Sequence, residues 1–189
     1  MNKVDQNPCI DILVSKLENN HYQLQVLYLN KCDLEDADGV MIANALTPNM
    51  RKLYMNNNHF TKVTAIKLAE MIEFPDIKLK ELGLKWNQIN GEGGCRIAEA
   101  LSQDKDKELK ILDLSWNKIG VYKQDFKPKH IGETWGKALI ENKSLVHLDL
   151  SFNKICEEDT RVILEDIKSN QTLFGFHYQG NVSSGKTEK

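Results

Sequence analysis

The chain has 189 residues, of which 41% are hydrophobic, enough to build one compact domain or one short repeat array. Its formal net charge of -2 provides neither the basic surface of a nucleic-acid-binding protein nor a polybasic membrane tag. No stretch approaches the roughly 18 apolar residues of a membrane span, and the first residues lack a signal-peptide core. The composition therefore favours a cytoplasmic protein without membrane insertion or nucleic-acid partners.

The four cysteines are scattered singly along the chain, at Cys9, Cys32, Cys95 and Cys156. They lack both the clustered spacing of a zinc site and the pattern of a disulfide framework. We therefore expect reduced thiols, no metal and no cofactor.

In chain order, the first predicted element is a helix over residues 8–20. Ile10, Leu13, Val14 and Leu17 follow one another at helical spacing, which places them on one face. Such an amphipathic helix can cover the end of a repeat array, so we interpret it as an N-terminal cap.

An eleven-residue pattern, L-x-x-L-x-L-x-x-N-x-L, then recurs along the chain. Its first positions are Leu24, Met50, Leu79, Leu109, Leu145 and Leu173, and the sixth copy lacks the last apolar position. Successive copies begin 26 to 36 residues apart, which fits one strand, turn and helix in each repeat. We predict about six repeats in a single domain over residues 1–181, followed by a flexible tail at 182–189.

The spacing predicts where each side chain points. Positions four and six alternate with polar neighbours, so they face a core, while positions three, five and seven face outward. The asparagine at position nine can both donate and accept hydrogen bonds, so stacked copies can satisfy the backbone where the strand ends. Cys32 replaces it in the first copy, a substitution that this repeat tolerates.

Helical patterns separate the strands. Apolar residues recur every three to four positions in each segment, as at Ile66, Ala69 and Ile72. The segment from Gly132 to Leu139 predicts a weaker helix, because a glycine in a helix costs about 1 kcal/mol relative to alanine. No helical pattern follows Tyr178, so we expect a bare C-terminal edge.

The repeat length and strands such as Leu109 to Ile119 and Leu145 to Ile155 resemble the ribonuclease-inhibitor-like class of leucine-rich-repeat proteins. The resemblance covers residues 24–181. It implies an α/β right-handed solenoid, a horseshoe with a parallel inner sheet and outer helices, which holds protein partners on its concave face or rim. The Asp-Leu-Ser-Trp-Asn and Asp-Leu-Ser-Phe-Asn strands are also similar to intracellular repeat proteins of cilia and flagella.

The outward positions contain the candidate partner-binding residues. Tyr28 and Tyr54 occupy position five of adjacent repeats. Position eight forms an aromatic ladder in three consecutive repeats, made of Trp86, Trp116 and Phe152. Since exposed tryptophan and tyrosine are enriched in interface hot spots, we predict that these five residues, with Asp113 and Asp149, contact the partner. Alternatively, the ladder rings only stack on one another and cover the asparagine turn.

The fourth repeat is longer than its neighbours and carries a basic segment with two aromatic residues, from Val121 to His130. Insertions in solenoids emerge as loops, often on the binding face. The candidate contacts in this loop are Tyr122, Lys123, Phe126, Lys127 and Lys129. Alternatively, the insertion is only a tolerated surface loop.

The sequence does not favour an enzyme. Serine, histidine and aspartate residues recur on the predicted inner face, but Asp-Leu-Ser recurs because the repeat recurs, and an open sheet lacks a water-excluding pocket. The main functional hypothesis is therefore a non-catalytic protein-interaction module. The alternatives are a structural component of a cytoskeletal or ciliary assembly, docked through the C-terminal edge strand, and a regulator of a small GTPase.

Overall fold

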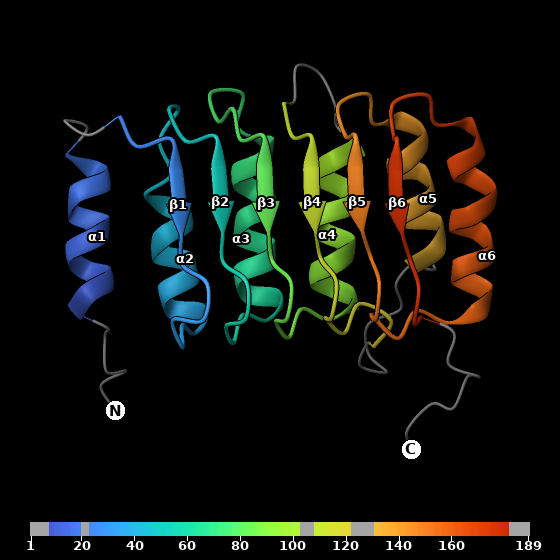
Figure 1. Cartoon of the computed structure of the whole chain (residues 1–189), viewed down its shortest axis with the longest axis horizontal. Coiled ribbons are helices and arrows are strands. Elements are labelled where there is room, and N and C mark those ends of the chain that lie inside the picture. Colours follow the sequence, from blue (N-terminus) through green and yellow to red (C-terminus); the bar gives the residue numbers. More distant parts are fainter. Residues whose placement is uncertain (1–7, 20–22, 103–107, 122–130, 182–189) are drawn as a thin grey trace.

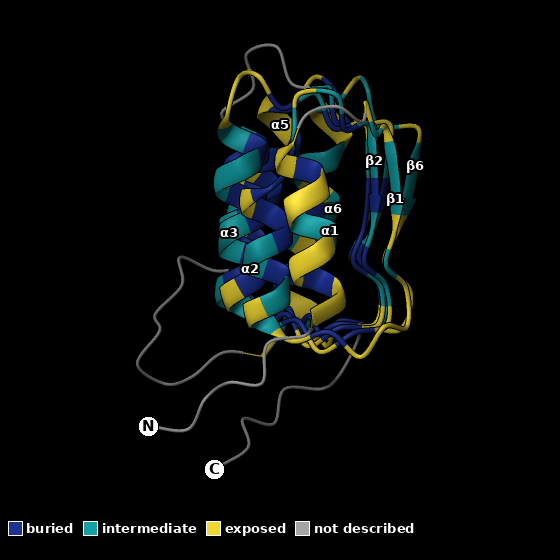
Figure 2. Ribbon diagram, turned by 90° about the vertical axis from the view of Figure 1, so that its left-hand side faces the viewer, coloured by how far each residue is buried: buried dark blue, intermediate teal, exposed yellow. Residues whose placement is uncertain are grey.

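The computed structural model describes residues 8–19, 23–102, 108–121 and 131–181. Strands and helices alternate along these residues and form two layers, with the sheet on one side and the helices on the other (Figures 1 and 2). The strands are β1 (Val26–Tyr28), β2 (Lys52–Tyr54), β3 (Glu81–Gly83), β4 (Ile111–Asp113), β5 (His147–Asp149) and β6 (Gly175–His177). The helices are α1 (Pro8–Glu18), α2 (Asp36–Asn44), α3 (Lys62–Glu73), α4 (Gly91–Ser102), α5 (Ile131–Glu141) and α6 (Glu157–Asp166), followed by the 3₁₀ turn η1 (Ile167–Ser169).

The strands form one parallel sheet in the order β1-β2-β3-β4-β5-β6. Equivalent positions of neighbouring repeats are paired, so that Leu53 lies opposite Leu82 and Leu112 opposite Leu148. This register confirms the alignment of the repeats that the sequence predicted, and it places each outward position in a row across the sheet.

The core lies between the two layers, where Figure 2 shows the buried residues. Positions four and six of the second to fifth repeats are almost fully buried, as predicted: Leu53, Met55, Leu82, Leu84, Leu112, Leu114, Leu148 and Leu150. Leu27, Leu29 and Phe176 are only half-buried. These three residues belong to the first and last repeats, whose strands have a neighbour on one side only within the described part of the chain.

The asparagines at position nine form a ladder that joins consecutive repeats. Nδ2 of Asn117 donates to the carbonyl oxygens of Leu84 (2.9 Å), in the preceding repeat, and Leu114 (3.0 Å), in its own. Its Oδ1 accepts a hydrogen bond from the backbone N–H of Ile89 in the preceding repeat (3.0 Å). Asn58, Asn87, Asn153 and Asn181 donate in the same two directions.

This ladder confirms the predicted role of asparagine and explains the exception at Cys32. Each asparagine stabilises the repeat before its own, and no strand precedes β1 among the described residues. Position nine of the first repeat therefore has no preceding carbonyl to cap, and cysteine is sufficient there.

The helix predicted over residues 132–139 is present, and the structure shows why its glycines are there. Helix α5 extends from Ile131 to Glu141 and buries Trp135 completely. A Cβ atom at Gly132 would lie 2.7 Å from the backbone of Asp159, so glycine lets α5 and α6 approach closely. The packing of the two helices offsets the low helix propensity of glycine.

None of the helices in the described part of the chain is both long and apolar enough to cross a bilayer. Within the same residues, no three histidine, cysteine or acidic side chains gather as a metal site would require.

Candidate functional site

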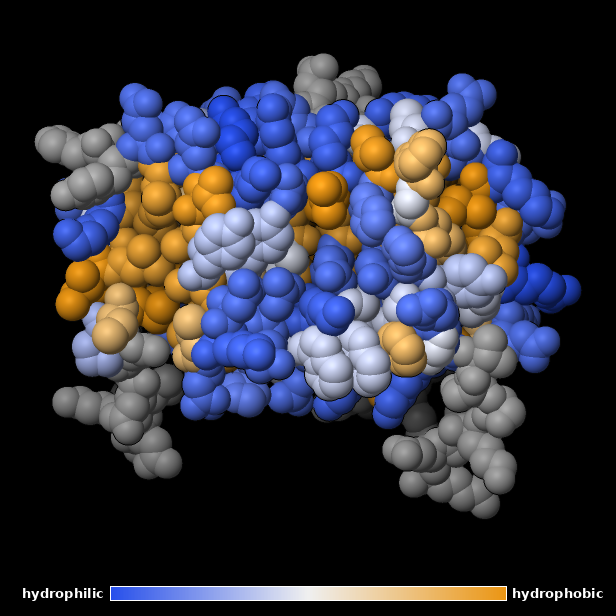
Figure 3. Space-filling view, in the orientation of Figure 1, coloured by the Kyte–Doolittle hydropathy of each residue, from blue (hydrophilic) through white to orange (hydrophobic). Residues whose placement is uncertain are grey.

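The candidate residues lie on the strand face, which we define as the surface of the sheet opposite the helices. It is the face seen in Figures 1 and 3. Position five of each repeat forms a row across the middle of this face, and position eight forms a second row where the strands end. The predicted site residues of the described chain all belong to these two rows.

Tyr28 and Tyr54 stack in the middle row. Their ring centroids are 4.8 Å apart and the rings are inclined by only 7°. The next position of this row is Gly83, where a Cβ atom would lie 2.8 Å from Cδ1 of Tyr54. Glycine therefore leaves room for the Tyr54 ring to lie across the neighbouring strand, while Tyr28 remains largely exposed.

Hydrogen bonds fix the position of Tyr54. Its hydroxyl group donates to Oε2 of Glu81, and Oε1 of Glu81 lies 2.8 Å from Nζ of Lys52. Burial and the hydrogen bond to Glu81 together raise the pKa of Tyr54 to about 12. The hydrogen bonds from Lys52 and Tyr54 lower the pKa of Glu81. Glu81 therefore stays ionised and continues to hold the tyrosine near neutral pH.

The predicted aromatic ladder is confirmed as a stack. The ring centroids of Trp86 and Trp116 are 4.2 Å apart, and those of Trp116 and Phe152 are 4.1 Å apart. Both tryptophans remain exposed, whereas Phe152 is half-buried. The stack ends on Gly180, which occupies position eight of the last repeat.

Position eight has a backbone feature that the sequence analysis missed. Every residue in this row has a positive φ, from 55° at Lys31 to 74° at Gly180. In this left-handed region a residue with a side chain costs about 1–2 kcal/mol. Tryptophan is therefore an unfavourable choice for the backbone alone, and stacking with neighbouring rings contributes about 0.5–1.5 kcal/mol per pair in return. A structural contribution of the ladder is compatible with a role in binding.

In Asp113 and Asp149, one carboxylate oxygen accepts hydrogen bonds from the same repeat. Oδ1 of Asp113 accepts hydrogen bonds from the backbone N–H (2.9 Å) and the hydroxyl (2.6 Å) of Ser115. Oδ1 of Asp149 accepts one from the backbone N–H of Ser151 (2.8 Å). The two aspartates are paired in register on β4 and β5, so their carboxyl groups are neighbours on the strand face.

The prediction that position seven lines the outer surface is wrong at two repeats. Ser115 and Ser151 are only 1% and 2% exposed. The serine hydroxyl groups are thus inaccessible for the nucleophilic chemistry that the Asp-Leu-Ser segments superficially suggest. The histidine rings of this face contact each other: the ring centroids of His147 and His177 are 4.8 Å apart.

The structure adds three exposed apolar residues that the sequence analysis did not select: Ile111, Val146 and Phe174. They lie at the starts of consecutive strands. Figure 3 shows apolar surface over this part of the sheet, and a second apolar area between α1 and β1. A comparison of position two between repeats would have revealed the change, since Gln25, Arg51, Lys80 and Lys110 are followed there by Val146 and Phe174.

The candidate loop contacts Tyr122, Lys123, Phe126, Lys127 and Lys129 lie outside the described residues. The predicted tail at 182–189 does so as well. The predicted C-terminal edge strand is β6, and Phe174, directly before it, is almost fully exposed.

Comparison with known proteins supports the repeat assignment. A family model described as "Leucine Rich repeat" matches residues 76–98, 107–121 and 141–155. The mouse protein "NACHT, LRR and PYD domains-containing protein 14" is 28% identical over 169 residues. That alignment covers 77% of this chain but 17% of the mouse protein, so the chain spans only a small part of this relative.

Two solved structures share the fold. The structure titled "Leiomodin-1 Actin-Binding Site 2 (ABS2)" matches with a TM-score of 0.65 and 20% identity, covering 87% of this chain and 91% of that one. The tropomodulin C-terminal domain of Caenorhabditis elegans matches with a TM-score of 0.61 and 18% identity, covering 85% and 92%. The open parallel sheet with its layer of helices is the fold that these neighbours share with this chain.

Proposed function

Because the chain is a leucine-rich-repeat protein, a fold that generally serves as a protein-interaction scaffold, we propose that it holds a partner protein against its strand face without catalysing a reaction. The observation that carries this proposal is the pair of exposed aromatic stacks, Tyr28 with Tyr54 and Trp86 with Trp116. Asp113, Asp149 and Phe152 complete the proposed footprint.

The stacks are suited to binding because their geometry is fixed before a partner arrives. An interface side chain that becomes ordered on binding costs about 0.5–1.5 kcal/mol. Tyr54 is already held by Glu81, and Trp116 lies between Trp86 and Phe152. These rings can therefore bury apolar area with a small loss of conformational entropy.

The test is affinity capture from a cell extract with the intact chain and with a variant of the strand face. The variant combines Tyr28→His, Trp86→Asn and Trp116→Asn, which use residue types that this chain itself places at equivalent positions, His177 and Asn57. Asn57 has a φ of 57°, so asparagine fits the left-handed backbone of position eight.

A matched control changes exposed apolar residues of the helix layer, Phe74→Ser and Ile140→Ser. We expect a protein that binds the intact chain and the control but is lost from the strand-face variant, while circular dichroism of all three chains is the same. Equal capture by all three would contradict the proposal.

A second candidate function is a structural role in a cytoskeletal or ciliary assembly. It rests on the outer edge of β6, which pairs with no further strand among the described residues, and on the exposed Phe174 beside it, since an open strand edge can dock on another chain. The name of the leiomodin structure suggests actin as the first protein to try. Co-sedimentation of the intact chain with actin filaments, lost in Phe174→Ser, would support this function. Failure of the intact chain to co-sediment would contradict actin as the partner.

A further inference from the structure

The C-terminal half of the strand face combines an apolar edge with a pair of carboxylates. We define the apolar edge as Ile111, Val146 and Phe174, which are 36%, 40% and 96% exposed. The backbone N–H of Phe174 donates to the carbonyl of Val146, and that of Val146 donates to the carbonyl of Lys110, beside Ile111. The three residues therefore lie on consecutive strands, about 4.8 Å from one strand to the next.

The repeat does not require apolar side chains at Val146 and Phe174, because position two is polar in each of the first four repeats. Ile111 occupies position three, where the neighbouring strands have Glu81 and His147. Burial does not explain the change, because Phe174 is almost fully exposed. An apolar residue exposed at consecutive repeats indicates a surface that a partner covers.

On β4, Asp113 lies two residues beyond Ile111. On β5, Asp149 lies two residues beyond His147, which is paired with Ile111. Like charges directly opposite each other on neighbouring strands are unfavourable. No lysine or arginine of the described residues forms an ion pair with either aspartate. Glu81, on the neighbouring strand β3, is instead paired with Lys52.

The N-terminal half of the strand face carries more cationic residues. Lys31, Arg51 and Lys85 lie there, while Lys52 and Lys80 are ion-paired with Glu81 and Glu108, and Lys110 is the cationic residue beside Ile111 in the C-terminal half. A cationic segment of a partner is therefore repelled by the first repeats and attracted to the aspartate pair. The aspartate pair therefore favours a cationic segment in the C-terminal half.

We propose that the C-terminal half of the strand face binds an amphipathic helix that carries an arginine beside an apolar stripe. The guanidinium group lies between the carboxylates of Asp113 and Asp149, since its planar array of N–H donors can serve both at once. The apolar stripe packs against Ile111, Val146 and Phe174. This assignment rests on the proposed binding function and names the chemistry of its partner.

The spacing of the surface matches such a helix. Asp113 lies two residues along the strand from Ile111, about 6.6 Å, and Asp149 lies three residues from Val146, about 10 Å. Side chains three or four residues apart on a helix have Cβ atoms about 5–6 Å apart. An arginine and a leucine at this helical spacing can therefore reach the carboxylates and the apolar edge together.

The experiment uses two labelled helical peptides that differ in one feature. Both carry leucine at every third or fourth position, and their flanking charged positions are arginine in one and glutamate in the other. Fluorescence anisotropy with the full chain gives the affinity of each peptide. We expect the arginine peptide to bind at least about tenfold more tightly than the glutamate peptide.

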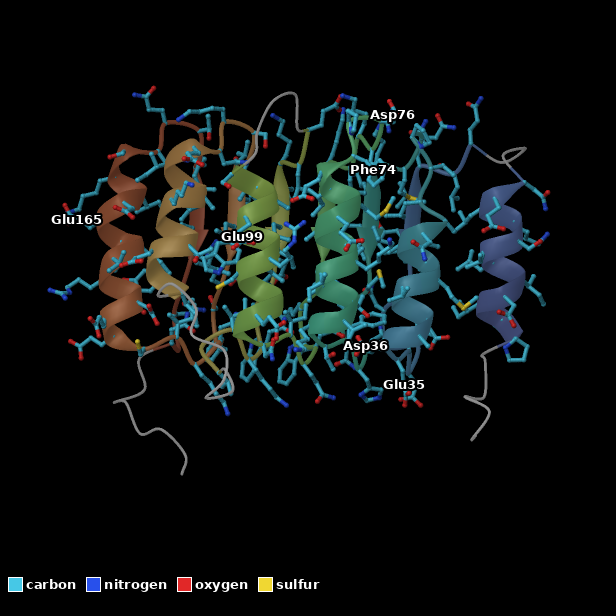
Figure 4. The ribbon with its side chains drawn as sticks, turned by 180° about the vertical axis from the view of Figure 1, so that it is seen from behind. Glu35, Asp36, Phe74, Asp76, Glu99 and Glu165 are labelled. Atoms are coloured by element: carbon cyan, nitrogen blue, oxygen red, sulfur yellow. The ribbon has the colours of Figure 1, made fainter. Side chains whose placement is uncertain are left out.

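The variants separate the two halves of the proposal. Asp113→Asn with Asp149→Asn keeps an oxygen to accept the hydrogen bonds from Ser115 and Ser151 but removes the charges, so it abolishes the preference for arginine. Phe174→Ser with Val146→Thr weakens the binding of both peptides. The controls Glu99→Gln with Glu165→Gln, and Phe74→Ser, lie on the helix layer, where Figure 4 shows all three side chains, and they leave binding unchanged.

Failure of the arginine peptide to bind, equal affinity for both peptides, or a preference that persists without the two aspartates would overturn the inference. The outcome is distinguishable from failure of the proposed function. If the changes at Tyr28, Trp86 and Trp116 still abolish capture, the strand face binds a partner of different chemistry. If those changes leave capture intact, the proposed function itself fails.

Discussion

The ring of Phe152 lies directly against Gly180, because a Cβ atom added to that glycine would come within 2.3 Å of Cδ1 of the ring. Gly180 has a φ of 74°, in the left-handed region that favours glycine. The last rung of the aromatic ladder therefore depends on a residue without a side chain in the next repeat.

We expect Gly180→Ala to destabilise the C-terminal repeat by about 1–2 kcal/mol, since alanine is strained at this φ and its methyl group displaces Phe152. Urea denaturation measures the stability, and near-ultraviolet circular dichroism reports the changed environment of the aromatic rings. Unchanged spectra and stability would show that the ladder does not need this contact.

The backbone cost and the stacking energy at Trp116 can be separated by two substitutions. Trp116→Ala and Trp116→Gly both remove the ring, but only glycine relieves the left-handed backbone at φ 57°. We expect the glycine variant to be about 1 kcal/mol more stable than the alanine variant in urea denaturation. Equal stabilities would mean that the positive φ stores no strain at this position.

The asparagine ladder predicts a large effect for Asn117→Ala. The change leaves the buried carbonyl groups of Leu84 and Leu114 without this donor and the N–H of Ile89 without its acceptor. We expect a loss of about 2–4 kcal/mol in the free energy of unfolding, because an unsatisfied buried group costs about 1–3 kcal/mol.

Two controls accompany this measurement by thermal and urea unfolding. Asn44→Ala changes an exposed asparagine at the end of α2. Cys32→Asn adds an asparagine where no strand precedes its own among the described residues. Each should change stability by less than about 0.5 kcal/mol. A strong stabilisation by Cys32→Asn would contradict the view that each asparagine serves the preceding repeat.

Asp36 makes the junction between α2 and α3 sensitive to acid. Burial raises the pKa of this carboxyl group, but hydrogen bonds from the side chains and backbone of Thr61 and Thr64 outweigh it and leave the pKa below its ordinary value. The contribution to stability is therefore complete above the ordinary carboxyl range and is lost as the pH falls through the lowered folded-state pKa.

We expect Asp36→Asn to cost about 1 kcal/mol at neutral pH, the usual contribution of a helix cap, and to flatten the decline of stability in acid. Unfolding midpoints measured in urea from neutral to acidic pH check this. Parallel pH profiles for the two chains would show that another carboxyl group controls the acid sensitivity.

The repeated spacing was sufficient to predict the order of strands and helices, their register and the inward direction of residues such as Leu53 and Leu112. It also placed Tyr28 beside Tyr54 and Trp86 beside Trp116. These properties follow from the sequence because side chains alternate along every strand and equivalent residues of stacked repeats become neighbours.

Other properties depend on how closely neighbouring repeats approach, and only the tertiary structure decided them. The alternation of side chains did not reveal the burial of Ser115 and Ser151, and the need for Gly132 depends on the backbone of α6. The left-handed backbone at position eight and the exposure of Phe174 are likewise set by the turn that follows each strand and by the end of the sheet. A periodic pattern determines the direction of a side chain, whereas its strain and exposure depend on three-dimensional neighbours that the pattern does not contain.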